Sequence, residues 1–164
     1  MPYTIQDGFP YYIQMVGDKD FRSLFKSEEN FNFFGAFSEE QSTYRYAFGK
    51  WNIKQILGHI TDHERIMTYR ALRFSRNDTT LLPGYDQNFF VDNSRFDELS
   101  WQHLLQDYKN VRAATNSFID GLSPSQLKFK GQAWKFELTV QEFLKATIGH
   151  EMHHISVIKE RYCK

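Results

Sequence analysis

Apolar residues recur at steps of three and four in four segments of the chain, which is the spacing produced by one face of an α-helix. The segments cover about residues 18–37, 52–75, 96–120 and 139–162. The second segment carries the longest stripe, made of Ile53, Ile56, Leu57, Ile60, Met67, Ala71 and Phe74. Four amphipathic helices of about five turns each predict an all-α fold, a four-helix bundle.

Residues at the ends of these segments favour particular helix boundaries. Asp18 or Asp20 is a candidate cap for the first helix. Gly121 is a candidate stop for the third helix. The fourth helix is expected to open on a capping box, in which Thr139 and Glu142 satisfy each other's backbone N–H groups.

The connections between the predicted helices are unequal in length. Residues 77–95 and 122–138 form long stretches for linkers inside one compact domain. The second stretch alternates apolar and charged residues around 128–130 and 135–137, which favours a short hairpin. Long crossovers imply that not every sequential pair of helices is antiparallel.

Composition is that of a globular protein and excludes several functional classes. The length of 164 residues predicts a single domain, residues 1–164. Because 20 basic residues balance 20 acidic ones, we expect no nucleic-acid partner. No apolar run approaches the roughly 18 residues that span a bilayer, so we expect no membrane partner. The first residues lack a basic patch followed by an apolar stretch, and we expect a cytoplasmic protein.

Aromatic residues make up 17% of the chain, which is a high share for a bundle of this size. Not every phenylalanine and tyrosine can reach one core, so some are expected to remain on the surface. Exposed aromatic patches usually mark interfaces between proteins. We therefore expect a homodimer.

Five of the six histidines fall in the second and fourth predicted helices. His59 and His63 are four residues apart, as are His150 and His154, and His153 lies between the latter two. Side chains at this spacing lie about 5–6 Å apart on one helix face, so a pair can converge on a metal ion. The alternative is that these histidines are ordinary core or surface residues. The spacing also leaves open whether His59 or His63, and His153 or His154, acts as a ligand.

No other motif indicates chemistry as strongly as the histidines. The sequence contains no GxSxG nucleophile motif, no phosphate-binding P-loop and no GxGxxG motif. Cys163 is a poor candidate nucleophile because residues near a terminus are rarely held in a defined geometry. The acidic residues of the histidine-bearing helices, Asp62, Glu64, Glu151 and Glu160, are expected to be solvated or paired with neighbouring basic residues. Asp62 and Glu151 are alternatively candidates to orient imidazole rings.

The chain resembles the DinB-like superfamily over about residues 10–162. The resemblance rests on the order of five runs, which are YRYAFGKWNIK at 44–54, LGHITDHER at 57–65, YRALR at 69–73, LPGYDQ at 82–87 and GHEMHHISVIKERY at 149–162. It implies a four-helix bundle with up-down-down-up connectivity. This connectivity agrees with the long crossovers inferred above.

The resemblance also implies one metal site. The ligand positions of the family fall on His59, His150 and His154, which leaves His63 and His153 outside the site. Relatives bind a divalent ion, commonly nickel or zinc. Three imidazole ligands leave coordination positions open, as in catalytic rather than structural metal sites.

The resemblance therefore implies a metal-dependent enzyme that acts on a small-molecule substrate. Some relatives are thiol S-transferases with a low-molecular-weight thiol as cosubstrate, and water in the same place would make a hydrolase. No catalytic residue is assigned besides the metal ligands. The candidates to line the mouth of the pocket are Tyr69, Arg73, Asp86 and Gln87, although each of them singly is expected to be an ordinary capping or surface group. A bundle that binds a metal or ligand for storage or sensing, without catalysis, is the alternative.

Overall fold

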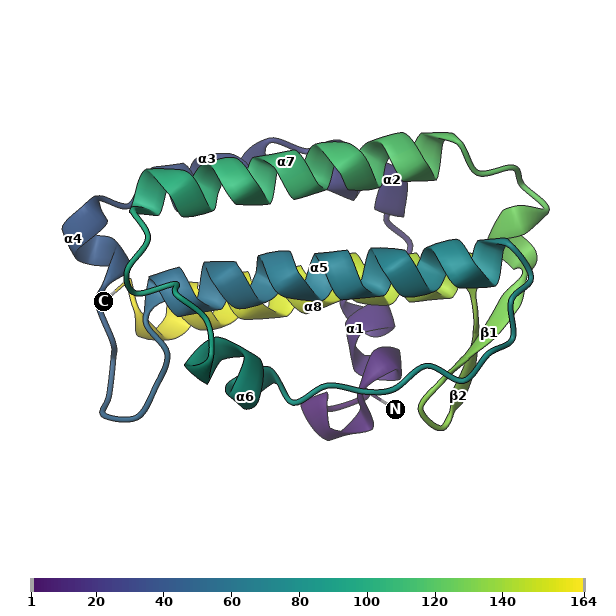
Figure 1. The fold of residues 1–164 in the computed structure, drawn as a ribbon, viewed down its shortest axis with the longest axis horizontal. Coiled ribbons are helices and arrows are strands. Elements are labelled where there is room, and N and C mark those ends of the chain that lie inside the picture. The colour runs from purple at the N-terminus through teal and green to yellow at the C-terminus, as the bar shows by residue number, and fades with distance from the viewer. Residues whose placement is uncertain (1, 164) are drawn as a thin grey trace.

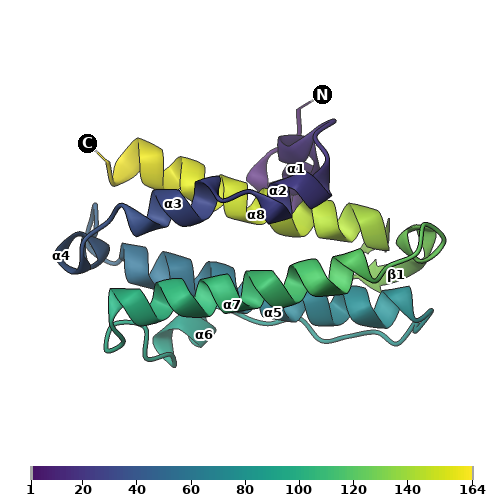
Figure 2. The same ribbon diagram turned by 90° about the horizontal axis from the view of Figure 1, so that it is seen from above.

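Three long helices and one broken segment form the bundle in the computed structural model, which describes residues 2–163. Helices α5 (Ile53–Ser75) and α7 (Trp101–Asp120) run in the same direction, whereas α8 (Val140–Arg161) runs the opposite way (Figure 1). The short helices α2 (Phe21–Lys26) and α3 (Glu29–Gly35) follow one another antiparallel to α5, between α7 and α8 (Figure 2). The predicted four-helix bundle with up-down-down-up connectivity is confirmed.

Capping residues in the sequence set the starts of two long helices. Asn52 and Gln55 form a capping box at the start of α5. Thr139 and Glu142 form the predicted capping box at the start of α8. Each box provides hydrogen-bond partners for backbone N–H groups that the first turn leaves unpaired. None of the helices within residues 2–163 is long and apolar enough to cross a membrane.

Helix α7 begins at residue 101 rather than near residue 96. The Ser100 side chain caps it by accepting a hydrogen bond from the backbone N–H of His103. Phe96 lies before the helix, with its ring against α5 at Gly58, where a Cβ atom would come within 2.6 Å of that ring. Gly121 follows the last residue of α7, as predicted.

The segment over residues 18–37 is not one helix, so this prediction is wrong. The chain is extended at Ser27, where ψ is 136°, and α2 ends there. The Ser27 hydroxyl accepts a hydrogen bond from the backbone N–H of Glu29 (3.2 Å), which favours a new helix start at α3. The break lets Phe25 and Phe34 pack into different parts of the core.

Several short elements lie outside the four predicted segments. They are η1 (Ile5–Asp7), α1 (Phe9–Val16), α4 (Glu39–Ser42) and α6 (Gln87–Asp92). Helix α1 crosses α8, and α6 interrupts the long connection between α5 and α7 (Figure 1). Asp20, one of the two predicted caps, accepts hydrogen bonds at the start of α2.

The connection after α7 contains the predicted hairpin. A short turn, η2 (Gln126–Lys128), leads into β1 (Lys130–Ala133), which pairs antiparallel with β2 (Phe136–Thr139). The ring of Phe74 lies against Gly131, where a Cβ atom would come within 2.1 Å of it. The hairpin therefore closes the bundle over the end of α5.

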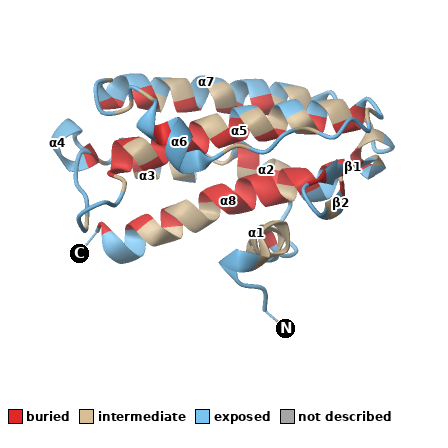
Figure 3. Cartoon of the chain, turned by 60° about the horizontal axis from the view of Figure 1, so that its bottom comes forward, coloured by how far each residue is buried: buried red, intermediate tan, exposed pale blue. Residues whose placement is uncertain are grey.

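A polar layer separates two apolar clusters in the core. One cluster includes Phe74 and Phe143 near the hairpin, and the other includes Leu57 and Tyr108. Buried residues follow much of α8 (Figure 3). Between the clusters, α5, α7 and α8 carry the buried polar side chains His59, His63, Glu64, Arg112, His150 and Glu151. Burial of polar groups is costly unless they find partners, so this layer is the natural place to look for function.

Replacing Gly149 by alanine is expected to destabilise the protein by about 1–3 kcal/mol. A Cβ atom there would lie 2.1 Å from the backbone carbonyl oxygen of Tyr12, so α1 would have to move away from α8. Gly35→Ala is the matched control, because nothing lies within 4 Å of a Cβ atom at that position. Urea unfolding of both variants measures the difference. Equal unfolding midpoints would contradict the close packing of α1 on α8.

Candidate metal centre

Three histidine side chains meet in the polar layer. His59 projects from α5, whereas His150 and His154 project from successive turns of α8. The Nε2 atom of His150 lies 3.1 Å from that of His59 and 3.2 Å from that of His154. One ligand atom from each residue lies within 4.8 Å of the other two. The fold thus brings together the three residues that the family resemblance selects.

Burial favours the neutral form of these imidazole rings. It lowers the pKa of His59 to about 4. It also lowers the pKa values of His150 and His154 well below the ordinary value, and neighbouring histidines add to this effect. A neutral imidazole has the free lone pair that a metal ion requires. At neutral pH the cluster therefore offers three nitrogen donors.

The spacing of the nitrogens fits one metal ion better than hydrogen bonds among the rings. The Nε2 atom of His150 faces two other Nε2 atoms, although it has either one proton or one lone pair. Zinc binds imidazole nitrogen at about 2.0–2.1 Å, which places two tetrahedral ligands about 3.3 Å apart. The Nδ1 atom of His150 is buried and has no hydrogen-bond partner among the described residues. This ring therefore makes its polar contacts through Nε2 alone.

The other two clustered histidines lie beside this group. The ring of His63 stacks on that of His150, with centroids 3.6 Å apart and planes 13° apart. The Nδ1 atom of His153 lies 3.1 Å from the hydroxyl of Tyr11 on α1. Neither residue belongs to the converging group. Of each pair that the spacing leaves open, the converging group therefore contains His59 and not His63, and His154 and not His153.

Aromatic rings surround the three histidines. The ring of Trp51 lies 5.0 Å from that of His59 and stacks near that of His154 at 6.5 Å. Tyr12 packs edge-on against His150, with ring centroids 5.3 Å apart. Sequence reasoning missed both aromatic residues. Trp51 lies just outside a predicted helix, and Tyr12 lies on α1, which was not predicted.

A cavity of about 390 Å³ reaches the histidine cluster from the side of α6. Lys50, Trp51, Gln87, Asn88 and His154 are among the residues that line it. This volume is sufficient for a small organic molecule.

The four residues predicted at the mouth of the pocket lie in different places in the structure. Gln87 lines the cavity. Asp86 instead caps α6. Arg73 donates a hydrogen bond to the hydroxyl of Tyr69 (2.8 Å), and Tyr69 lines a different groove, between α5 and α7. Asp86, Tyr69 and Arg73 are therefore capping and surface groups, the alternative expected for them, because their partners are local groups outside the cavity.

Close to the histidines, two buried glutamates share one arginine of α7. Arg112 donates from Nε and Nη2 to the carboxylate of Glu64, at 3.0 and 2.9 Å, and from Nη2 to Glu151. Glu151 also accepts hydrogen bonds from Tyr108 and Asn30. Burial alone would lower the pKa of Arg112, but the two carboxylates raise it well above its ordinary value. The network connects α3, α5, α7 and α8.

This network corrects the expectation for the acidic residues. Glu64 and Glu151 are buried instead of solvated, and within residues 2–163 neither is hydrogen-bonded to an imidazole ring. Asp62 lies 3.7 Å from Arg65 and also orients no imidazole of the described chain.

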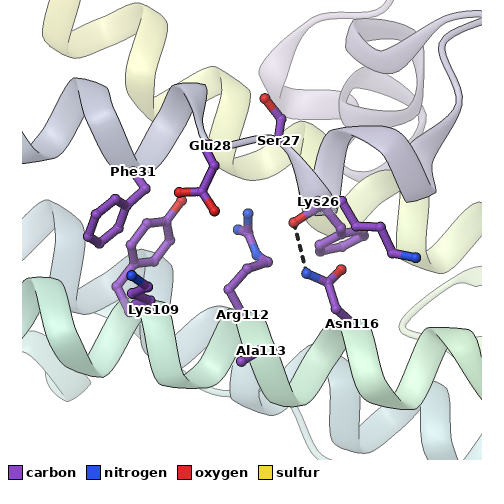
Figure 4. Close-up of a pocket in the computed structure, with 10 residues that line it drawn as sticks. Lys26, Ser27, Glu28, Phe31, Lys109, Arg112, Ala113 and Asn116 are labelled. Atoms are coloured by element: carbon purple, nitrogen blue, oxygen red, sulfur yellow. Dashed lines mark hydrogen bonds between the residues drawn. The ribbon is translucent and has the colours of Figure 1, made fainter.

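Figure 4 shows Arg112 beside a cavity of about 140 Å³, which lies between α7 and the break that separates α2 from α3.

Comparison with known proteins places the chain in a family. The sequence matches the model of the DinB superfamily over residues 28–158, a range that includes all three converging histidines. The chain belongs to the DinB superfamily. A search of curated proteins found no match.

One solved structure with the same fold is YfiT from Bacillus subtilis. It is described as a probable metal-dependent hydrolase with an unusual four-helix bundle topology. The TM-score is 0.72 at 16% sequence identity, and the match covers 98% of this chain and 89% of YfiT. At this identity the likeness shows the fold, whereas membership in the DinB superfamily rests on the family match.

Proposed function

We propose that this member of the DinB superfamily is a metal-dependent enzyme in which His59, His150 and His154 hold one divalent ion, nickel or zinc. The convergence of three neutral imidazoles carries the proposal, and one of them, His154, lines a cavity. Three protein ligands leave room for water or substrate, whereas structural zinc sites usually have four. When bound, such an ion supplies Lewis acidity, which lowers the pKa of an adjacent water or thiol.

The chain's own residues would position the substrate and limit access of water. Trp51 and Tyr12 pack against the imidazole rings and hold their orientation. Lys50, Gln87 and Asn88 provide polar groups along the cavity, where they would bind polar parts of a substrate. Rings fixed in this way keep the three nitrogens aimed at one point, which is the preorganisation that catalysis needs.

Two reactions fit this chemistry. Attack by water on a small electrophile would make the protein a hydrolase, and the description of YfiT supports this reaction first. Attack by a low-molecular-weight thiol would make it a thiol S-transferase, as the family resemblance implies. A non-catalytic bundle that stores or senses a metal is the alternative, and a fourth protein ligand would favour it. The converging group of the described chain holds three.

Turnover is expected to depend on His150 and to be independent of Cys163. The metal-loaded protein is assayed with p-nitrophenyl acetate, and separately with a low-molecular-weight thiol and chlorobimane. His150→Ala should reduce turnover by roughly 100-fold or more, because it removes a ligand of the Lewis acid. Cys163→Ser should retain turnover, because this thiol is exposed beyond the end of α8.

Two results would contradict this function. Turnover that survives His150→Ala and disappears in Cys163→Ser would indicate a cysteine nucleophile. Metal binding without turnover of either substrate class would favour the non-catalytic alternative.

We also propose that the protein is a homodimer. Large aromatic side chains, including Phe48, Tyr69 and Phe89, are exposed in the described fold. A second copy of the chain would cover part of this surface. Sedimentation at concentrations well above micromolar should give twice the 19.6 kDa mass of one chain. The mass of a single chain under these conditions would contradict the proposal.

A further inference from the structure

A second cavity, of about 420 Å³, lies between residues 81–84, the start of α1 and the hairpin. Residues 81–84 belong to the long connection between α5 and α6, which passes α1 and the hairpin (Figure 1). Arg70 of α5 is the charged residue in its lining, and no acidic residue of the described chain lines it. The cavity therefore combines one cation with apolar and amide groups.

The Arg70 guanidinium has hydrogen-bond donors to spare. Its Nη2 donates to the carbonyl oxygen of Pro83 at 2.8 Å, whereas Nη1 has only the sulfur of Met67 nearby, at 3.9 Å. Within the described part of the chain it has no carboxylate partner, although Arg65 and Arg73 on the same helix each pair with an aspartate. Arginine stays protonated even when partly buried. The positively charged guanidinium group of Arg70 thus lines the cavity without a carboxylate partner in the described part of the chain.

The walls of the cavity suit a flat apolar group. Phe9 and Leu82 line it, together with Trp134 at the turn of the hairpin. Trp134 is 69% exposed and has a φ of 54°, a left-handed conformation that bulky residues rarely adopt. Lys135 places its Nζ atom 4.6 Å from the centre of the indole ring, which adds a second positive charge nearby. The hairpin thus presents an indole ring at the rim, where an aromatic ligand can stack.

We propose that this cavity binds an aromatic carboxylate, with the carboxylate on Arg70 and the ring against Leu82 and Trp134. A guanidinium fork matches a carboxylate through two parallel hydrogen bonds. One arginine within apolar walls suits a singly charged acid, whereas a phosphate group would lack donors for most of its oxygens. The inference goes beyond the proposed metal chemistry and does not depend on it, because no member of the histidine cluster lines this cavity.

Titration of the purified 164-residue chain with 2-naphthoate, followed by amide NMR shifts, tests the proposal. Shift changes are expected at Arg70, around Leu82 and in the hairpin, and not at the three converging histidines. This localisation distinguishes the site from binding of the acid at a metal ion. Arg70→Gln should weaken binding at least about tenfold, because charge-assisted hydrogen bonds are lost. The neutral 2-naphthalenemethanol should bind the wild type and Arg70→Gln equally, and more weakly than 2-naphthoate binds the wild type.

Arg76→Gln is the matched control, because Arg76 is exposed at the end of the same helix and lies outside the cavity. It should leave the affinity unchanged. Trp134→Ala should weaken binding severalfold. Arg70→Lys, which keeps the charge and loses the planar fork, should fall between wild type and Arg70→Gln, and it serves as the test if Arg70→Gln does not fold.

Three results would overturn the proposal. One is an affinity unaffected by substitution of Arg70. Another is a set of shift changes confined to the histidine cluster. The third is the absence of saturable binding up to about 10 mM acid, which is weaker than any specific site of this kind should be.

Discussion

Replacing Arg112 by methionine is expected to lower the free energy of unfolding by about 3–5 kcal/mol. The substitution leaves Glu64 and Glu151 buried without the guanidinium that now bonds to both. Carboxylates in the interior without a counter-charge must be protonated or hydrated, and both cost free energy. Because whole domains are stable by only about 5–15 kcal/mol, a loss of this size should be obvious in urea unfolding.

Arg65→Met is the matched control for this substitution. Arg65 donates to Asp107 at 2.9 Å, and both side chains are about one-third to one-half exposed. An ion pair of this kind contributes at most about 1 kcal/mol. A loss below about 1 kcal/mol for Arg112→Met would contradict the buried network. Adding Glu64→Gln and Glu151→Gln to Arg112→Met should restore part of the stability, because no uncompensated charge remains.

Bound metal is expected to raise the thermal stability of the protein at neutral pH. A ligand that binds only the folded state at 1,000 times its dissociation constant adds about 4 kcal/mol. For a chain of this size that corresponds to a rise of roughly 8–16 °C in the unfolding midpoint. The comparison is between wild-type protein with added nickel or zinc and the same protein with a chelator. His154→Ala should show no such rise, and an equal rise in that variant would contradict the ligand assignment.

Acidification should lower the stability of the protein below about pH 6.5 and remove the added stabilisation by metal near pH 4. Histidine titrates near 6.5 in the unfolded chain, whereas burial lowers the pKa of His59 to about 4 in the folded chain. Between these values the unfolded chain binds more protons. The stability contributed by the neutral ring is therefore present above about pH 6.5 and is lost as the pH falls towards 4. Protons also compete with the metal for the same lone pairs, and in the folded chain this competition begins near the lowered pKa of His59, about 4. An unfolding midpoint of the metal-free protein that does not fall between pH 6.5 and pH 4, or a metal-dependent rise that is already lost at pH 6, would contradict this account.

The sequence predicts the elements whose ends and faces are encoded locally. α5 and α8 each combine a capping box with an apolar stripe, and both begin within a residue or two of their predicted starts. The break at Ser27 was missed because Leu24 and Phe31, seven residues apart, keep helical spacing across it. Whether these side chains belong to one helix or two depends on the core that they enter, which is a property of the whole bundle.

The histidine pattern predicts a metal site, but not which histidine of each cluster takes part. His59 and His63 lie on nearly the same face of α5, so the relative position of α8 decides between them. The role of Arg112 was not predicted, although its spacing four residues after Tyr108 and three before Thr115 offered a signal. All three residues are buried on one face of α7. An arginine within an apolar stripe indicates a buried partner on another helix.

Metal content measured by elemental analysis tests the central claim most directly. The comparison uses wild type, His59→Ala, His154→Ala and His63→Ala, each shown to be folded by circular dichroism. The wild type and His63→Ala should carry about one divalent ion per chain, because His63 lies outside the converging group. His59→Ala and His154→Ala should carry almost none. Undiminished metal in both of these variants, or loss of metal in His63→Ala with retention in His59→Ala, would contradict the assignment.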